Sequence, residues 1–240
     1  MSTIVEAVKS KALEAEEQYV SPYAPPAARA SAQTEKPVYE AGKRLLDIVL
    51  SLLGLIVLSP LFLIVAILIR REDGGPVIHT RICNGRNGAP CAMYKFRSMK
   101  TDADRLEKYF TPEQAEAYRR EVKLDHDPRI TRTGGFLRKT SIDELPQLVS
   151  ILKGDMSIVG PRPVVDDELS NYVGMQRDLI LSVRPGLTGY WQANGRSRVT
   201  YASGERQEME LYYVEHRSFW LDIKIILKTV LVVFRQEGAQ

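Results

Sequence analysis

The sequence predicts an α+β protein, mostly helical, with a single folded domain attached to a membrane by a helix broken at a Ser-Pro pair. Three observations lead to this class: an apolar stretch at residues 45–69, several helix-like segments after it, and two short strand-like segments between them. The chain has 240 residues, enough for one domain with a sizeable core and an extension. We expect an N-terminal extension at 1–40, a re-entrant membrane helix at 41–71 and a cytoplasmic domain at 72–240.

The N-terminal extension carries no recognisable functional signal. Residues 4–20 predict a short, mostly polar helix, and residues 21–37, which are rich in Pro and Ala, predict an extended linker. Residues 1–20 contain charged side chains and lack an apolar core segment, so they do not read as a secretory signal. We assign no function to residues 1–40.

The apolar stretch at residues 45–69 contains one acid, Asp47, and would extend about 38 Å as a straight helix, enough to cross a bilayer. The pair Ser59-Pro60 lies inside it; proline removes a helical hydrogen bond, and the serine hydroxyl can satisfy a freed carbonyl. Basic pairs flank both ends of the stretch: Lys43-Arg44 and Arg70-Arg71. The positive-inside rule would place both ends in the cytoplasm, which favours a bent hairpin over the alternative, a Pro-kinked span.

The rest of the chain predicts short alternating elements. Strands are expected at residues 76–82 and 92–97, and helices at 102–109, 112–122, 143–152, 164–181 and 203–216. The chain ends on an apolar run at 219–234, in which Trp220 suits a membrane interface while Lys224 and Lys228 can extend towards phosphates. This run is either an interfacial amphipathic helix or a buried core helix.

Composition excludes several classes of protein. The formal net charge is only +3, whereas a duplex-binding protein usually has a stronger basic excess, so no nucleic-acid partner is expected. The two cysteines, Cys83 and Cys91, are too few for a disulfide framework. Together with His79 they would still lack a fourth metal ligand nearby, so we interpret them as reduced cytosolic thiols.

The segment at residues 125–163 contains the side chains best suited to catalysis. Basic side chains gather in its first part: Arg129, Arg132, Arg138 and Lys139. The adjacent carboxylates Asp143 and Glu144 follow them. Arginine binds phosphate oxygens in a bidentate manner, magnesium takes carboxylates together with substrate phosphates, and a carboxylate can act as a nucleophile. The pattern therefore indicates phosphate chemistry with a divalent metal.

Each part of this segment also has a structural interpretation. Ser141 and Glu144 match a helix capping box, or Asp143 could itself be the N-cap of a helix with Pro146 in its first turn. Either cap would place Asp143 near the positive end of a helix dipole, which would keep it ionised. The rigid Pro161-Arg162-Pro163 could be a stiff turn.

Taken together, these motifs resemble those of the bacterial sugar transferases, the monotopic polyprenol-phosphate phosphoglycosyl transferases. The resemblance extends over about residues 43–234 and rests on linked motifs: Lys43-Arg44-x-x-Asp47, Ser59-Pro60, Lys95-Phe96-Arg97-Ser98-Met99, Asp127-Pro128-Arg129-Ile130-Thr131, Leu137-Arg138-Lys139-Thr140-Ser141, Asp143 to Leu148, Gly154 to Pro163 and Arg184 to Gly189. The chain departs from the family pattern at Gly135, where many members carry a basic residue, and at Cys91, where an aromatic residue is common.

The resemblance implies a membrane helix that turns back at Ser59-Pro60. It implies that Asp143 attacks the sugar-linked phosphorus of a UDP-sugar, releasing UMP, and that undecaprenyl phosphate then takes the sugar phosphate from the aspartyl intermediate. Glu144 would help to hold Mg²⁺ with Asp143 or steer protons. Arg138 and Arg162 would bind phosphates, and the implied substrate-binding set also includes Lys95, Arg97 and Arg129.

The implied location is the cytoplasmic face of the bacterial inner membrane, and the implied role is the first step of exopolysaccharide, O-antigen or related glycoconjugate assembly. The segment from Arg184 to Tyr190 favours galactose or glucose as the sugar. The sequence carries no signal for an oligomeric state. A non-enzymatic membrane scaffold would explain the basic residues but not Asp143 and Glu144 among them, and a multi-span phosphotransferase would need several apolar stretches.

Overall fold

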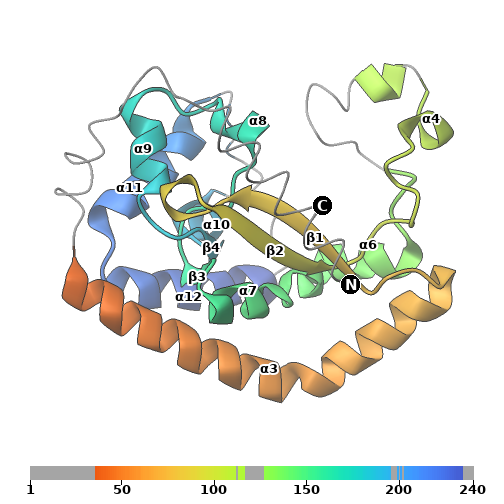
Figure 1. Ribbon diagram of the computed structural model, residues 1–240, viewed down its shortest axis with the longest axis horizontal. Coiled ribbons are helices and arrows are strands. Elements are labelled where there is room, and N and C mark those ends of the chain that lie inside the picture. The colour runs from red at the N-terminus through yellow and green to blue at the C-terminus, as the bar shows by residue number, and fades with distance from the viewer. Residues whose placement is uncertain are drawn as a thin grey trace.

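The described part of the chain folds into one mostly helical α+β domain with two small two-stranded sheets (Figure 1). The computed structural model describes residues 36–111, 113–116, 127–195, 199, 201 and 203–234. The helix expected at 4–20, residues 21–35 of the linker, and residues 112 and 117–122 of another expected helix lie outside this part of the chain.

Helix α3, Pro37–Asp73, contains the whole apolar stretch and is one continuous helix through Pro60. Figure 1 shows α3 along one edge of the molecule, bent in its middle rather than divided into two separate arms. The hydroxyl of Ser59 donates a 2.8 Å hydrogen bond to the carbonyl of Ile56, the acceptor that the nitrogen of Pro60 cannot serve. The helix ends at Gly74, which has a left-handed φ of 71° and donates its N–H to Arg70.

One side of α3 packs on the domain and the other is exposed. Asp47, the acid inside the apolar stretch, is 3% exposed and accepts hydrogen bonds from the Ser157 hydroxyl at 3.1 Å and from the Ile158 N–H at 2.9 Å. The exposed apolar side chains include Leu45, Val49, Leu52, Leu53, Ile56, Val57, Leu63, Ile64 and Leu68. Within the described residues, α3 is the one helix long and apolar enough to cross a membrane.

The larger sheet is the hairpin of β1 (Ile78–Asn84) and β2 (Pro90–Phe96), close to the two expected strands. The strands are antiparallel, Cys83 lies opposite Cys91, and both thiols are free and buried. β1 is largely exposed, whereas β2 packs against α7 (Gln147–Lys153). This packing fixes the end of β2, which carries Lys95, beside the turn before α7.

The smaller sheet pairs β3 (Ser157–Val159) and β4 (Gly186–Thr188) in parallel. The two strands approach so closely that a Cβ on Gly186 would lie 2.1 Å from the nitrogen of Gly160. The N–H of Gly186 donates to the carbonyl of Pro161 at 2.7 Å. The segment from Arg184 to Gly189 therefore has a structural role as well, because it holds the Pro-Arg-Pro turn.

The described residues also form shorter helices: α4 Leu106–Tyr109, α6 Arg132–Thr140, α8 Asp166–Leu169, α9 Met175–Leu181, α10 Tyr190–Asn194 and α11 Glu205–His216. The single helix expected at 164–181 is wrong, because the chain forms α8 and α9 with a turn at Gly174, where φ is +53°. Helix α6 was not expected at all.

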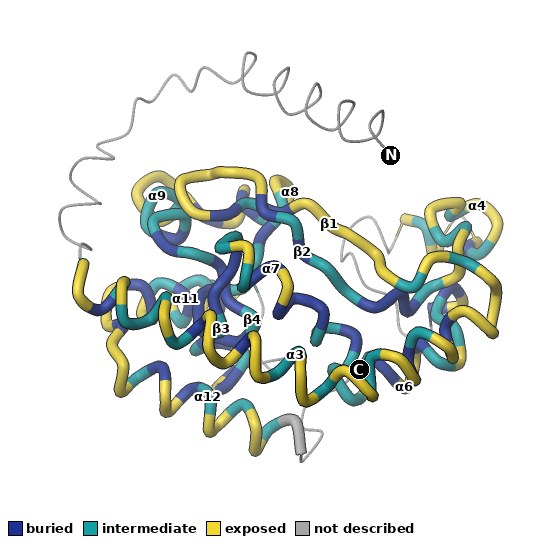
Figure 2. Tube along the Cα trace, turned by 60° about the horizontal axis from the view of Figure 1, so that its bottom comes forward, coloured by how far each residue is buried: buried dark blue, intermediate teal, exposed yellow. Residues whose placement is uncertain are grey.

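The C-terminal helix α12, Phe219–Phe234, combines features of both structures considered for it. Asp222 on its buried side accepts hydrogen bonds from Tyr39 at 2.7 Å and Tyr213 at 2.8 Å, and pairs with Lys43 at 2.9 Å. Its other side exposes apolar residues, with Trp220 66% exposed. In Figure 2, α3 and α12 run along the same side of the molecule, with exposed positions on both.

Candidate active site

The two expected catalytic carboxylates lie in a turn between α6 and α7. Helix α6 ends at Thr140. The next residue, Ser141, has a left-handed φ of +58°, a conformation that costs a non-glycine residue about 1 kcal/mol. A single 3-10 turn, η2 (Ile142–Glu144), follows. Helix α7 begins only after Pro146, and no side chain caps the start of η2 or of α7. Both capping arrangements considered for Ser141 and Asp143 are therefore wrong.

Helix α3 holds both helices that flank this turn. The carboxylate of Glu72, near the end of α3, accepts the N–H of Arg132 at 2.8 Å at the start of α6. Near the start of α3, the guanidinium of Arg44 donates to the carbonyls of Ile151 at 2.6 Å and Leu152 at 2.8 Å, at the end of α7. The apolar helix thus contributes directly to the position of the Asp143 turn.

Asp143 is buried, with 8% of its surface exposed. Burial, followed by the charge of Glu144, raises the pKa of Asp143 to about 6, although Lys95 and Arg138 act in the opposite direction. Arg138, one of the preceding arginines, therefore favours the ionised form as expected, but burial and Glu144 outweigh it and the net shift of the pKa is upward. At pH 7 a carboxyl with this pKa is still about nine-tenths ionised, so the charged form, which a carboxylate nucleophile needs, predominates.

Two basic side chains from different elements meet the carboxylate pair. Lys95 on β2 places its Nζ 2.7 Å from Oε1 of Glu144. Arg138 on α6 acts electrostatically on Asp143, and its Nε donates to the hydroxyl of Ser98 at 2.9 Å. The structure thus gathers four of the expected site residues around one turn. Ser98, which orients Arg138, was not singled out from the sequence, although it lies within a motif that was.

Two other expected phosphate-binding residues are engaged in internal contacts. The guanidinium of Arg97 pairs with Asp73 at the end of α3, and its Nε donates to the carbonyl of Pro76 at 2.6 Å. Arg129 is 4% exposed, and its Nε and Nη2 bind the two carboxylate oxygens of Asp127 at 2.9 and 2.6 Å. Arg97 thus joins the end of β2 to the end of α3, and Arg129 also reaches another segment, because its Nη1 donates to the carbonyl of Ala103 at 3.3 Å.

Arg162 lies in a separate cluster around Trp191. Its backbone N–H donates to the carboxylate of Glu210 at 3.1 Å, and its guanidinium carbon is 5.8 Å from the centre of the Trp191 ring. Arg206 from α11 stacks on the same ring at 4.1 Å. Sequence reasoning missed Trp191, Arg206 and Glu210; the spacing of Arg206 and Glu210 by one helical turn was the available signal.

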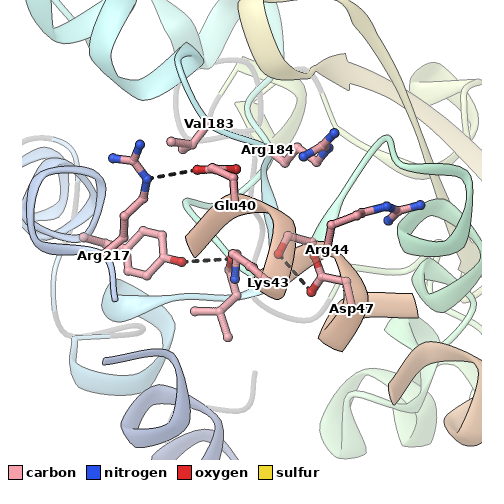
Figure 3. A pocket seen from close by; sticks show the side chains of 10 residues that line it. Glu40, Lys43, Arg44, Asp47, Val183, Arg184 and Arg217 are labelled. Atoms are coloured by element: carbon pink, nitrogen blue, oxygen red, sulfur yellow. Dashed lines mark hydrogen bonds and ion pairs between the residues drawn. The ribbon is translucent and has the colours of Figure 1, made fainter. Parts of the chain in front are cut away.

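A small cavity lies beside the N-terminal half of α3 (Figure 3). Its lining includes Lys43, Arg44, Arg184, Arg217, Glu40 and Asp47. Arg217 and Glu40 point towards one another in Figure 3, with 3.3 Å between Nε and Oε1. The volume of about 10 Å³ admits one water molecule and not a phosphate, so we do not place a substrate there.

The donor set at the turn suits magnesium bound together with substrate. Among the described residues, no group of three or more His, Cys, Asp or Glu side chains could enclose a metal ion. Mg²⁺ commonly takes only one or two carboxylates and completes its shell with substrate phosphates and water. Asp143 and Glu144 supply such a pair, and the repulsion from Glu144 that raises the pKa of Asp143 would be relieved by a divalent cation.

Comparison with known proteins gives a consistent result. The profile of the family described as bacterial sugar transferase matches residues 38–236. The chain is 43% identical to the exopolysaccharide production protein ExoY of Sinorhizobium fredii over 85% of this chain and 90% of that protein. It is 44% identical to an undecaprenyl-phosphate galactose phosphotransferase of Salmonella typhimurium, covering 82% of this chain and 41% of that protein. It is 38% identical to a UDP-glucose:undecaprenyl-phosphate glucose-1-phosphate transferase of Escherichia coli, with 82% and 41% covered.

Proposed function

We propose that this chain, which belongs to the bacterial sugar transferase family and is a phosphoglycosyl transferase, moves a hexose 1-phosphate from a UDP-sugar to undecaprenyl phosphate through a phosphosugar–aspartyl intermediate. The single observation that carries the proposal is the buried Asp143 carboxyl, set in a turn with Glu144, Lys95 and Arg138 around it. The names of the relatives support galactose or glucose as the sugar.

In the proposed first step, a carboxylate oxygen of Asp143 attacks the phosphorus that carries the sugar. The bond from that phosphorus to the oxygen bridging the two phosphates breaks, and UMP leaves with the electron pair. An acyl phosphate then joins Asp143 to the hexose phosphate. Because the pKa of Asp143 is about 6, the carboxylate is the main form at neutral pH, and Arg138 faces the negative charge that accumulates.

In the second step, a phosphate oxygen of undecaprenyl phosphate attacks the same phosphorus. The bond between phosphorus and the Asp143 oxygen breaks, which regenerates the carboxylate and leaves the hexose on an undecaprenyl diphosphate. The two substrates never need to be bound at once, so the proposal requires ping-pong kinetics. A scaffold protein, the alternative class, would release no UMP.

Asp143 and Glu144 would hold Mg²⁺. The bound ion would supply charge neutralisation for the transferring phosphates. Lys95 has a separate role in this proposal: its ammonium group, 2.7 Å from Glu144, holds that carboxylate in place next to Asp143.

We also propose that α3 enters and leaves the membrane from the cytoplasmic side, with its bend at Ser59-Pro60 inside the bilayer. Support comes from the exposed apolar side chains along α3 and from contacts near both of its ends with the same domain through Arg44 and Glu72. Single cysteines at positions 40 and 74, in a variant without Cys83 and Cys91, should both be labelled from the cytoplasm alone. Labelling of either position from the periplasm would replace the hairpin with a span.

The decisive experiment for the chemistry is intact-protein mass spectrometry after mixing with UDP-galactose or UDP-glucose and Mg²⁺, before any lipid is added. One added hexose phosphate is expected, and peptide mapping should place it on Asp143. Asp143→Asn should give neither adduct nor UMP. An adduct on Glu144, or turnover with intersecting double-reciprocal lines, would refute the covalent route.

A further inference from the structure

We propose that Arg206 forms a second phosphate-binding subsite, remote in sequence from the Asp143 turn, in which its guanidinium edge holds two oxygens of one phosphate group. This rests on the proposed function only for the identity of the phosphates, which belong to either the nucleotide diphosphate donor or the lipid phosphate acceptor. The geometry that points to the site is independent of the chemistry at Asp143.

The first observation is the pair of donors that Arg206 leaves unused. The residue is 9% exposed, and its Nε and Nη2 are buried without a hydrogen-bond partner among the described residues. These two groups point in the same direction along one edge of the planar guanidinium, which is the edge that binds carboxylates and phosphates side-on. Buried donors, charged ones above all, are normally satisfied, so an unused edge requires an explanation.

In Arg129, both donors of the corresponding guanidinium edge have hydrogen-bond acceptors. Its Nε and Nη2 bind the two oxygens of Asp127 at 2.9 and 2.6 Å, and the residue is 4% exposed. The fold can therefore satisfy a buried arginine internally. At Arg206 the obvious internal partner is Glu210, one helical turn later on α11. The two Glu210 oxygens instead accept a hydrogen bond from the backbone N–H of Arg162, at 3.1 and 3.3 Å.

The second observation is the environment of the guanidinium. Its carbon lies 4.1 Å from the centre of the Trp191 ring and 3.8 Å from that of the Tyr201 ring. Two aromatic faces fix the plane of the group and limit its contact with water, which strengthens a bond to an oxyanion. The pre-set plane also reduces the conformational entropy lost on binding.

The third observation is the local charge. Arg162 contacts Trp191 as well, so two cations share one aromatic side chain. Glu210 is the acid whose charge interacts with both arginines, and burial raises its pKa to about 7, so it is only partly ionised at neutral pH. The cluster therefore carries excess positive charge, which suits a phosphate better than a neutral group.

The experiment measures binding rather than turnover, using the full chain in phosphatidylcholine nanodiscs. In one arm, isothermal titration calorimetry gives the Kd of UDP. In the other, the stabilisation by undecaprenyl phosphate incorporated in the nanodisc is measured by thermal denaturation. Arg206→Lys keeps the charge and loses the two-donor edge, and Arg206→Met also loses the charge. We expect about tenfold weaker binding for Lys and up to about a hundredfold for Met, in one arm only.

Arg217→Lys is the matched control, because Arg217 is also a buried arginine at α11 but donates to Val214 and Glu40. It should lower Tm and leave the Kd of UDP unchanged, whereas Arg206→Lys should leave Tm unchanged. If Arg206→Lys raises the Kd of UDP, the subsite belongs to the nucleotide donor. If it reduces the stabilisation by undecaprenyl phosphate, the subsite belongs to the lipid acceptor. Unchanged binding in both arms, or an Arg206→Lys protein that is unfolded or less stable, would overturn the proposal. Neither arm needs the Asp143 adduct, so failure of the covalent mechanism would be recognised separately.

Discussion

Replacing Asp143 with Asn is expected to abolish transfer and at the same time stabilise the protein. The pKa of Asp143 rises from an ordinary value of 3.8 to about 6, mainly through burial. Each tenfold change in proton affinity corresponds to about 1.4 kcal/mol, so the ionised carboxyl lowers the free energy of unfolding by about 3 kcal/mol at pH 7. The Asn amide is still a buried polar group, so we expect a gain of about 2 kcal/mol. For a domain of this size that raises Tm by about 4–8 °C.

The pH dependence of this Tm difference shows whether it arises from the ionisation of Asp143. The folded state binds the Asp143 proton more tightly than the unfolded state, so the destabilisation is present above about pH 6 and disappears as the pH falls towards 4. Thermal denaturation of the wild type and of Asp143→Asn should therefore differ at pH 7 and converge near pH 4.5. A Tm for Asp143→Asn no higher than that of the wild type at pH 7, or a difference independent of pH, would refute the reasoning.

Asp127 provides the matched control, because it is equally buried at 8% exposure. Burial alone would raise its pKa, but the hydrogen bonds and charge of Arg129 outweigh that effect and lower it. Its ionised form therefore stabilises the fold, and this stabilisation is lost as the pH falls through the lowered pKa. Asp127→Asn should lower Tm at pH 7, opposite in sign to Asp143→Asn.

Three further outcomes are expected. Arg138→Ala should reduce kcat/KM by about tenfold or more in a UMP-release assay, because charge-assisted bonds contribute about 1.5–3 kcal/mol; unchanged turnover would remove it from the site. Gly134→Ala should destabilise the fold, because its Cβ would lie 1.9 Å from the Ser98 carbonyl oxygen. Gly135→Ala should not, because its Cβ would lie 3.9 Å from the side chain of Ile130; equal Tm values for the two variants would contradict this. Glu144→Gln should still form the aspartyl adduct, but more slowly, in time-resolved mass spectrometry, and an undiminished rate would separate Glu144 from the reaction.

The sequence predicted those parts of the molecule that local pattern determines. The hairpin of β1 and β2 and helix α12 lie close to their expected positions, since strand alternation and an apolar run are local signals. The grouping of Asp143, Glu144, Lys95 and Arg138 was anticipated through linked motifs. By contrast, the left-handed Ser141 that separates α6 from η2 has no glycine or asparagine to indicate it, and the helix expected from residue 143 begins only at Gln147.

Long-range partners account for most of what the sequence could not predict. Arg97 looked available for a phosphate, but Asp73, which pairs with it, lies on another element. Asp127 was visible two positions before Arg129, so that internal pair could have been anticipated. The raised pKa of Asp143 depends on burial, which only the packing of the turn against β2 and α6 determines.

The contacts of α3 have a consequence for protein engineering. Anchors that merely hold an enzyme at a surface can be exchanged or deleted, but here Arg44, Asp47 and Glu72 attach the apolar helix to α7, β3 and α6. Deleting the helix would leave the carbonyls at the end of α7 and the N–H groups at the start of α6 without these partners. A water-soluble version must therefore retain the inward side chains of α3 and replace only outward ones, such as Leu53 and Val57, with polar residues. The side chains proposed to face the membrane and those that position the Asp143 turn thus belong to one and the same helix.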